Sequence, residues 1–304
     1  MTVALACTLC GSLKTRALLS FTTAELIQKW KEQWGIDIES EFSGLSKFEL
    51  RQCEECAIRF FSPESLCGSS RIYAILDRFD WYYVPHKWEH LQALQDISAC
   101  KSGLEIGCGF GDFIQLAKKT KGIQITGLEQ NPSAIQEGQR RGITMHSASL
   151  QDYRMRTTEK HDAIFCFQVL EHVPSPGEFL NLCCELLPTK GRLILGLPNA
   201  DSFLKFQFNL LDLPPHHMSR WPIDTLKFLP ELFPLRLLRI ECEPLPEHQI
   251  DGYVEAYCDR LARSISPYDA CHPFLKSRLG RILRRTGLTK LLRGMTIYAA
   301  FERL

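Results

Sequence analysis

The fold is decided by the stretch Leu104-Glu105-Ile106-Gly107-Cys108-Gly109-Phe110-Gly111. It joins an apolar run to an acid and three alternate glycines, and a helical pattern follows. A second apolar run, Ile125-Thr126-Gly127-Leu128-Glu129, ends in another acid. This pattern is typical of a nucleoside-binding βαβ unit, in which glycines let the backbone approach the ligand and the distal acid accepts hydrogen bonds from ribose hydroxyls.

The acids around the glycine turn bear on the charge of the ligand. Glu105 precedes the turn and Asp112 opens the helix, so both would repel a pyrophosphate bound there. A dinucleotide is disfavoured for a second reason, since position 112 lacks the glycine of a dehydrogenase fingerprint. S-adenosylmethionine (SAM) fits better, because it carries a sulfonium and an ammonium beside a ribose that Glu129 can hold.

On these residues the chain resembles the class I SAM-dependent methyltransferases, whose motif I is similar to Glu105–Gly111. Three further blocks occur in the order of that family: Phe165–Pro174, Leu186–Asn199 and Asp212–His217. The last resembles a segment of a subgroup linked to bacterial polysaccharide and secondary-metabolite pathways. The resemblance covers residues 85–304 and implies an α/β fold with a Rossmann-like sheet that is mostly parallel and has an antiparallel last strand.

Apolar runs and helical patterns alternate through this region, as expected for a parallel sheet flanked by helices. The sequence predicts strands near 102–107, 123–129, 143–146, 162–168, 191–197, 235–243 and 295–302, and helices near 111–120, 132–140, 175–187 and 223–231.

The resemblance also implies which residues surround SAM. Ser149 stands where many relatives place an acid for the adenine amino group, so this role passes to Asp152 or to the backbone. Gln168 follows the fourth strand, where the methionine end of SAM lies in the family. The aromatic rings of Tyr82 or Tyr83 suit a sulfonium, although they could equally pack a domain junction. The expected SAM-binding residues are Glu105, Gly107, Cys108, Gly109, Gly111, Glu129, Gln130, Leu150, Asp152, Gln168 and Tyr82.

Three histidines are candidate catalytic bases. Methyl transfer from SAM is an in-line displacement that depends mainly on alignment, and a base is needed only when the acceptor must lose a proton. His172 follows the fourth strand, and His216 and His217 follow the fifth. We favour His217 or His216, oriented by Asp212. A purely structural role for each histidine stays open.

Two CxxC pairs precede the methyltransferase-like region. Cys7-Thr8-Leu9-Cys10 and Cys53-Glu54-Glu55-Cys56 offer four thiolates, the ligand set of a closed structural Zn²⁺ site. Between them, Thr22–Glu25 resembles a capping box that opens a helix ended by Gly35. The alternation of residues 47–52 predicts a strand that leads into the second pair. The segment Cys53–Pro63 is similar to the zinc-binding N-terminal domain found on some of these methyltransferases, but Ala57 replaces the usual glycine.

Bulk properties favour an intracellular enzyme. The chain has 304 residues, 45% of them hydrophobic, and a net charge of +1, which gives no general nucleic-acid or membrane signal. The sequence shows neither a transmembrane run nor a cleavable leader. The 13 cysteines are an odd number, and most lie singly in apolar segments, so we expect free thiols and a cytoplasmic location.

The predicted organisation has three parts. Residues 1–64 form a zinc-ribbon-like domain with a helical insertion, residues 65–100 a helical and aromatic connector, and residues 101–304 the methyltransferase core. The connector is expected to hold one helix over 71–79 and a second that starts at Pro85.

The core carries a helical insertion at about 245–293. Its segment 276–293 is basic and amphipathic, and Gly287 is expected to break it into two helices. This segment could pack on the core, or meet a membrane surface, RNA or an anionic substrate.

The sequence therefore predicts a SAM-dependent methyltransferase that acts on a small molecule, most plausibly a sugar or related metabolite, at O, N or C. An RNA methyltransferase is a second hypothesis, with nucleic acid a less favoured partner. A SAM-binding scaffold without turnover is the third. The oligomeric state does not follow from the sequence.

Overall fold

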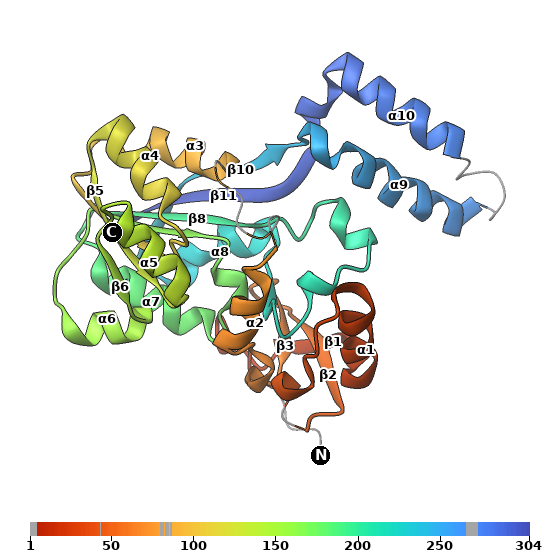
Figure 1. Cartoon of the computed structure of the whole chain (residues 1–304), viewed down its shortest axis with the longest axis horizontal. Coiled ribbons are helices and arrows are strands. Elements are labelled where there is room, and N and C mark those ends of the chain that lie inside the picture. Colours follow the sequence, from red (N-terminus) through yellow and green to blue (C-terminus); the bar gives the residue numbers. More distant parts are fainter. Residues whose placement is uncertain (1–4, 43, 80–81, 83–84, 86, 266–272) are drawn as a thin grey trace.

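The computed structural model describes residues 5–42, 44–79, 82, 85, 87–265 and 273–304. Within these residues the chain forms a seven-stranded sheet and a four-stranded sheet. Figure 1 shows the small sheet and its helix α1 at one end of the molecule, with the helices α9 and α10 projecting beside it. Tyr83 lies outside the described residues, so its predicted role stays a prediction.

The large sheet has the strand order β10-β11-β8-β7-β4-β5-β6. Strands β4 to β8 run parallel, whereas β11 is antiparallel to both of its neighbours. This confirms the predicted Rossmann-like sheet with an antiparallel last strand. Its strands are β4 (Ser102–Ile106), β5 (Gln124–Glu129), β6 (Met145–Ser147), β7 (Ala163–Phe167), β8 (Arg192–Pro198), β10 (Leu235–Pro244) and β11 (Arg293–Arg303).

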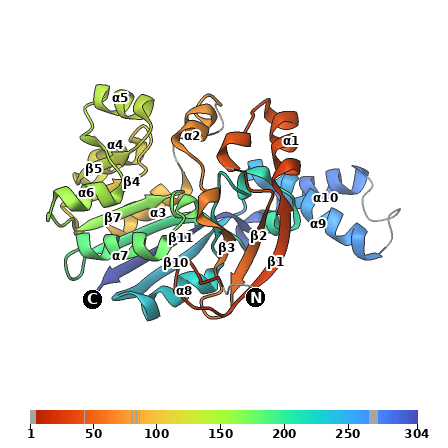
Figure 2. The same cartoon turned by 90° about the horizontal axis from the view of Figure 1, so that it is seen from below.

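Side chains of the core strands alternate between two helical layers. In β7, Ile164 and Cys166 join one apolar cluster, while Phe165 and Phe167 join the other, as the period of a strand requires. Helices α6, α7 and α8 contribute to the first cluster, and α3, α4 and α5 to the second. Figure 2 shows α4 and α5 on one side of the sheet and α7 and α8 on the other. The core helices are α4 (Asp112–Lys121), α5 (Pro132–Arg140), α6 (Leu150–Arg156), α7 (Pro176–Leu186) and α8 (Ile223–Leu232).

The small sheet takes its fourth strand from the methyltransferase core. Strands β1 (Thr15–Thr22), β2 (Lys47–Cys53) and β3 (Arg59–Ser62) form an antiparallel meander. Strand β9 (Ser219–Arg220) then pairs with β3, with Arg59 opposite Arg220. The sequence predicted β2 alone of these, because β9 is too short to show a period. Backbone hydrogen bonds thereby join a segment of the core to the N-terminal sheet.

Helix α1 (Thr23–Trp34) begins and ends where the sequence indicated. Gly35 ends it with a φ of 69°, a left-handed conformation that glycine adopts without strain. The predicted capping box is wrong in detail, because the Thr22 hydroxyl donates to Glu25 at 2.8 Å and accepts no backbone N–H. Trp30, fully buried, anchors the helix in the N-terminal apolar cluster instead.

The connector holds two helices. Helix α2 (Ser70–Leu76) packs in the N-terminal apolar cluster, whereas α3 (Trp88–Asp96) packs on the core sheet. The second helix begins at Trp88 and not at the predicted Pro85.

Helices α9 (Ile250–Ile265) and α10 (Pro273–Thr286) form the predicted insertion. Gly287, with a φ of 67°, ends α10 as expected. The basic residues of α10 looked unpaired in the sequence, but Lys276 lies 3.0 Å from Asp259 and Arg284 lies 2.7 Å from Asp251. Acids of α9 therefore neutralise part of the basic face. Among the described residues, no helix combines the length and apolarity needed to cross a bilayer.

Candidate functional site

The glycine turn joins β4 to α4, and it accepts no side chain at two positions. Gly107 has a φ of 66° and Gly111 a φ of 78°, values that L residues rarely adopt. A Cβ on Gly107 would collide with Val169, and one on Gly111 with Ile143. The turn therefore presents bare backbone at the carboxyl ends of the strands, where sheets of this type bind ligands.

Glu129 ends β5 with its carboxylate turned toward this loop. Its Oε2 accepts a hydrogen bond from the Gly109 amide at 2.8 Å. Its Oε1 accepts from the amides of Gln130 and Asn131 at 2.8 and 2.9 Å. Three backbone donors thus fix the acid beside the glycine turn, while the neighbouring Gln130 is exposed.

Glu105 is a buried acid, and one of its carboxylate oxygens lacks a hydrogen-bond partner among the described residues. It is 3% exposed, and its Oε2 makes no hydrogen bond to any described residue. Burial raises the pKa of Glu105 well above its usual value, Lys87 opposes this shift, and the nearby carboxylates add to it. Asp112, which the sequence analysis grouped with Glu105, instead forms an ion pair with Arg141 at 3.0 Å. Cys108 in the same turn is buried, and burial raises the pKa of its thiol.

The loop after β6 contains α6, a helix that the sequence did not indicate. The Ser149 hydroxyl accepts from the Asp152 amide at 3.1 Å and donates to the Asp152 carboxylate at 2.6 Å. This capping box holds the acid that we expected near the adenine. Leu150, expected as an apolar wall, is 5% exposed and belongs to the core cluster.

Gln168 links the end of β7 to helix α3. Its side-chain amide donates to Glu89 at 3.0 Å, and its backbone has a φ of 56°. Glu89 is 2% exposed and was not singled out in the sequence, because an isolated acid in a helical pattern carries no distinguishing signal.

The three candidate histidines meet beyond the ends of β7 and β8. His172 closes the 3-10 turn Leu170–His172, and His216 and His217 follow the turn Leu210–Asp212. Ring centroids lie 4.6 Å apart for His172 and His216, and 4.9 Å apart for His172 and His217. We call these three residues the histidine cluster.

Hydrogen bonds of the ring nitrogens indicate where the protons lie in the histidine cluster. Nδ1 of His172 lies 2.6 Å from the His216 carbonyl, and Nδ1 of His216 lies 2.8 Å from the Leu211 carbonyl. Nδ1 of His217 lies 3.3 Å from Oδ1 of Asp212. Because carbonyl and carboxylate oxygens accept, we assign the proton of His216 and that of His217 to Nδ1 and their lone pairs to Nε2.

Burial keeps the histidine cluster neutral. It lowers the pKa of His172 to about 4, an effect that backbone hydrogen bonds to His216 and Gln168 partly offset. Burial lowers the pKa values of His216 and His217 well below the usual value, and charge on the neighbouring rings lowers them further. All three rings are therefore neutral imidazoles at neutral pH, each with one nitrogen that can accept a proton.

Tyr82 contacts the histidine cluster directly. Its hydroxyl lies 3.1 Å from Nε2 of His216, and the two rings lie 5.7 Å apart. The cluster can bring one nitrogen of each ring within 4.8 Å of the others, a spacing that would suit a metal ion. The Tyr82 hydroxyl already contacts Nε2 of His216.

Asp212 orients His217 and is itself held by Arg220. The guanidinium Nε of Arg220 lies 2.8 Å from Oδ2 of Asp212. Burial raises the pKa of Asp212 to about 6, while Arg220 and Arg59 lower it. The carboxylate is therefore mostly ionised at neutral pH and can stabilise a positive charge on His217.

The four predicted zinc ligands converge. Their sulfur atoms all lie within 4.8 Å of one another, with Cys7 and Cys56 at 3.6 Å and Cys10 and Cys53 at 3.6 Å. Four thiolates around one tetrahedral zinc have a similar spacing, given Zn–S bonds of about 2.3 Å. Ala57 adopts a φ of 62°, so the second knuckle closes without the usual glycine.

The first knuckle packs on the start of α7. The Gly177 amide donates to the Thr8 carbonyl at 3.2 Å, and a Cβ at Gly177 would lie 2.5 Å from the Leu9 carbonyl oxygen. The N-terminal domain therefore contacts the core both here and through β9.

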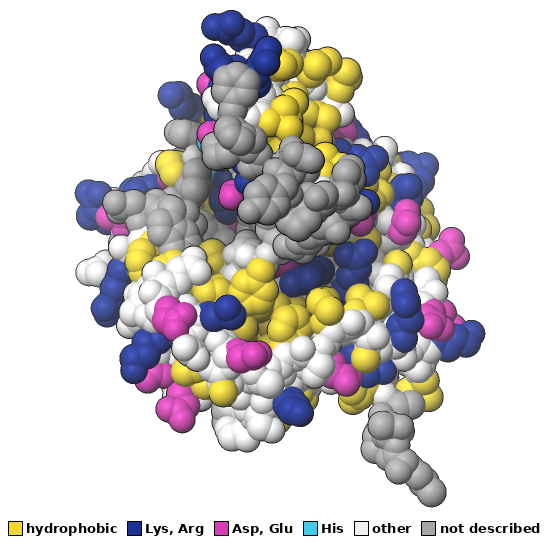
Figure 3. Space-filling view, turned by 90° about the vertical axis from the view of Figure 1, so that its right-hand side faces the viewer, with side chains coloured by type: hydrophobic (Ala, Val, Ile, Leu, Met, Phe, Trp, Pro, Cys, Tyr) yellow, Lys and Arg dark blue, Asp and Glu magenta, His cyan; other side chains and the backbone are white. Residues whose placement is uncertain are grey.

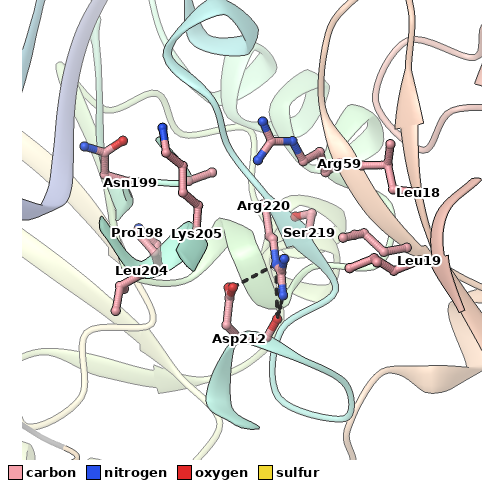
Figure 4. A pocket seen from close by; sticks show the side chains of 12 residues that line it. Leu18, Leu19, Arg59, Pro198, Asn199, Leu204, Lys205, Asp212, Ser219 and Arg220 are labelled. Carbon is pink, nitrogen blue, oxygen red and sulfur yellow. Dashed lines mark hydrogen bonds and ion pairs between the residues drawn. The ribbon is translucent and has the colours of Figure 1, made fainter. Parts of the chain in front are cut away.

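A cavity of about 290 Å³ opens between the N-terminal sheet and the loops that follow β8. We call it the seam pocket. Figure 4 shows the ion pair of Asp212 and Arg220 at its centre, with Arg59 toward the N-terminal sheet and Lys205 on the opposite side. Asp212 therefore lines the seam pocket and also bonds to His217. Figure 3 shows the face of the molecule that points to the right in Figure 1, and hydrophobic side chains lie beside Lys and Arg side chains near the middle of this face.

Sequence reasoning missed the basic residues of the seam pocket. Arg59 and Arg220 stand opposite each other on β3 and β9, and strand pairing across so long a separation leaves no local pattern. Glu171, which is 1% exposed with an unpartnered Oε2, was also missed. Its Oε1 lies 3.9 Å from Nε2 of His172. The signal available in the sequence was its place directly before a candidate histidine.

Comparison with known families matches residues 81–240 to a family described as a methyltransferase domain. This span is more than half of the chain and runs from the connector through the glycine turn and the histidine cluster into β10.

Comparison with individual proteins gives similar relatives. The ubiquinone biosynthesis O-methyltransferase of Haemophilus ducreyi is 25% identical over 225 residues, which are 69% of this chain and 90% of that protein. The protein of the same name from Xanthomonas oryzae pv. oryzae is 28% identical over 123 residues, 38% of this chain and 50% of that protein. The crystal structure of a SAM-dependent methyltransferase from Archaeoglobus fulgidus shares the fold, with a TM-score of 0.50, 18% identity, and coverage of 78% of this chain and 95% of that one.

Proposed function

This chain belongs to the class I SAM-dependent methyltransferases, and on that premise we propose that it methylates a small molecule at an atom held against the histidine cluster. The observation that carries the proposal is the meeting of His217, Asp212 and the two neighbouring histidines beyond the carboxyl ends of β7 and β8. Ligands of such sheets bind at this edge, so the cluster adjoins the expected methyl donor.

The residues around the glycine turn fit SAM. Glu129 would hold the ribose hydroxyls, because three amides fix its carboxylate at the end of β5. The unpartnered Oε2 of Glu105 would face the positively charged methionine end. SAM supplies an activated methyl group on a sulfonium. Leu150, Asp152 and Gln168 stay in the expected set, as neighbours of adenine and methionine.

His217 is the best placed base. Its Nδ1 proton is directed at Asp212, so Nε2 can take a proton from an acceptor hydroxyl. Asp212 would stabilise the imidazolium that forms, which offsets the low pKa imposed by burial. His216 and His172 would position the acceptor, since Tyr82 engages the Nε2 of His216.

An oxygen acceptor is the form of this reaction that the site supports best. A hydroxyl must lose its proton during transfer, and the histidine cluster offers neutral imidazoles for it. The relatives named above act as O-methyltransferases in ubiquinone biosynthesis, which also favours oxygen. The sugar predicted from the sequence remains one candidate among hydroxyl-bearing metabolites.

We also propose that Cys7, Cys10, Cys53 and Cys56 hold one structural Zn²⁺. Four thiolates fill a tetrahedral shell and leave no position for substrate. The ion would fix the N-terminal sheet against the core and would take no part in methyl transfer. RNA is a less suitable substrate than a small molecule, because acids of α9 pair with Lys276 and Arg284 of the basic helix.

A calorimetric titration with SAM and a transfer assay test the function. We expect wild type to bind SAM and to pass a labelled methyl group to a small-molecule extract. His217→Gln should retain SAM affinity and lose at least about 100-fold in kcat, the usual scale of general-base catalysis. SAM binding without labelling of any extract fraction would favour the scaffold hypothesis, whereas label in RNA would favour an RNA methyltransferase.

A further inference from the structure

The seam pocket contains more positive than negative charge. Arg59, Lys205 and Arg220 line it, and Asp212 is the acid among the lining residues. Asp212 pairs with Arg220 at 2.8 Å, which neutralises one of the three cations. Nη2 of Arg59 lies 3.9 Å from Oδ1 of Asp201, which is a long contact for an ion pair. Lys205 forms no ion pair within the described part of the chain. Two cationic heads are therefore left weakly compensated at the two sides of the cavity.

These charges lie close together in a partly buried space. The side chains of Arg59 and Arg220 are 25% and 20% exposed. Burial lowers the pKa of Arg220, Asp212 opposes this shift, and the charge of Arg59 lowers the pKa further. Like charges held together out of bulk water are unfavourable unless an anion shares the site.

The remaining wall is apolar because of a bulge in β1. Ala17 pairs with Arg51 and Leu19 with Leu50, so Leu18 is an extra residue. Neighbouring side chains of a regular strand point to opposite faces, but here both Leu18 and Leu19 line the cavity. Leu19 is 53% exposed, a large apolar surface with no protein cover.

We propose that the seam pocket binds the part of the methyl acceptor that is not methylated, and that this part is an apolar group bearing a phosphate or a carboxylate. The anion would lie between Arg59 and Lys205, and the apolar group would lie on Leu18 and Leu19. This inference rests on the proposed function, and it makes the N-terminal domain a component of the acceptor site.

Asp212 connects this subsite to the chemistry. Its Oδ2 faces Arg220 at the seam pocket and its Oδ1 faces His217 in the histidine cluster. An acceptor anchored by its anion would thus extend past Asp212 and bring its hydroxyl to the base. Anchoring through a remote group aligns the reacting atom, which supplies most of the rate in an in-line displacement.

Binding of small probes tests the subsite without knowledge of the natural acceptor. We would titrate full-length protein, saturated with SAM, with phenyl phosphate, benzoate and benzyl alcohol. Both anions should bind, and benzyl alcohol should bind about tenfold more weakly, because it lacks the charge-assisted contacts. Arg59→Gln and Lys205→Gln should each weaken phenyl phosphate by about three- to tenfold, a modest loss because both groups are partly solvated. Lys227→Gln is the matched control, since Lys227 is 57% exposed on α8 away from the cavity.

The apolar wall has its own variant. Leu19→Ser should weaken phenyl phosphate but leave the affinity for inorganic phosphate unchanged, because only the aromatic probe buries the leucine surface. The proposal is overturned if benzyl alcohol binds as tightly as phenyl phosphate. It is equally overturned if neither anion binds, or if all variants bind the anions like wild type, since the sites are then adventitious.

The transfer assay identifies which anion the natural acceptor carries. After labelling with methyl-labelled SAM, the product should be retained by an anion-exchange resin. Phosphatase treatment should release a phosphate-bearing product and leave a carboxylate retained. Arg59→Gln should raise KM about three- to tenfold and change kcat little. A labelled product in the unretained fraction refutes the anionic subsite while leaving methyl transfer intact, and loss of SAM binding in wild type refutes the proposed function itself.

Discussion

Replacement of Glu129 by alanine gives the sharpest test of the SAM site. In the structure this carboxylate accepts hydrogen bonds from the amides of Gly109, Gln130 and Asn131 at 2.8 to 2.9 Å. We propose that it also accepts hydrogen bonds from the two ribose hydroxyls of SAM. Each hydrogen bond to a charged group contributes about 1.5 kcal/mol at the low end of the usual range. Loss of both contacts should cost about 3 kcal/mol, which is about a 100-fold rise in Kd.

The assay is calorimetric titration with SAM, alongside the 2′-deoxy analogue of S-adenosylhomocysteine. Wild type should lose affinity for the deoxy analogue, whereas Glu129→Ala should not distinguish it from the parent compound, because the partner of the missing hydroxyl is gone. Glu129→Gln, which keeps one acceptor oxygen, should lie between the two. Glu231→Gln, an exposed residue of α8, is the control. A folded Glu129→Ala protein whose Kd stays within about twofold of wild type would refute the ribose assignment.

Three further predictions concern the charge, the packing and the metal. Burial raises the pKa of Glu105, and a bound cationic SAM should lower it again, so that binding favours the loss of a proton. Calorimetry in two buffers of different ionisation enthalpy should show proton release and an affinity that rises with pH, and Glu105→Gln should abolish both effects. Gly177→Ala should lower the free energy of unfolding by about 1–2 kcal/mol, because the new Cβ meets the Leu9 carbonyl. Gly252→Ala on α9, where the new Cβ makes an ordinary contact, should be neutral or stabilising. Equal denaturation midpoints for the two variants would contradict the packing of the first knuckle on α7. Elemental analysis of the purified protein should find one zinc per chain. Cys53→Ser should lose the zinc and melt at a lower temperature, whereas Cys100→Ser should keep the zinc content and the melting temperature of wild type. Wild type without zinc after growth in zinc-supplemented medium would overturn the assignment.

The core elements could be predicted from the sequence because their determinants are local. The strands β4, β7 and β8 are buried on both faces, and β7 and β8 appear in the sequence as nearly continuous apolar runs. The glycines of the first turn mark backbone that no side chain can occupy. The pairing of two CxxC motifs likewise follows from ligand chemistry and not from distance along the chain.

Failures occurred where long-range partners decide the structure. The strand β9 exists because Ser219 and Arg220 complete the edge of β3, and two residues show no period. The capping contact of Asp152 with Ser149 at the start of α6 also escaped prediction, because α6 shows no clear helical period. The seam pocket depends on a bulge in β1 and on residues of both sheets, so no single segment encodes it.

The contribution of β9 to the N-terminal sheet limits how the domains of such proteins can be recombined. Cutting the chain after β3 would separate β9 from its partner strand and expose the edge of β3, an arrangement that invites aggregation. A chimaera that borrows another N-terminal domain must therefore also borrow the short core segment that pairs with it. Both segments line the seam pocket, so substitutions in the N-terminal sheet and substitutions in residues 212–220 should occur together when the substrate preference changes during evolution.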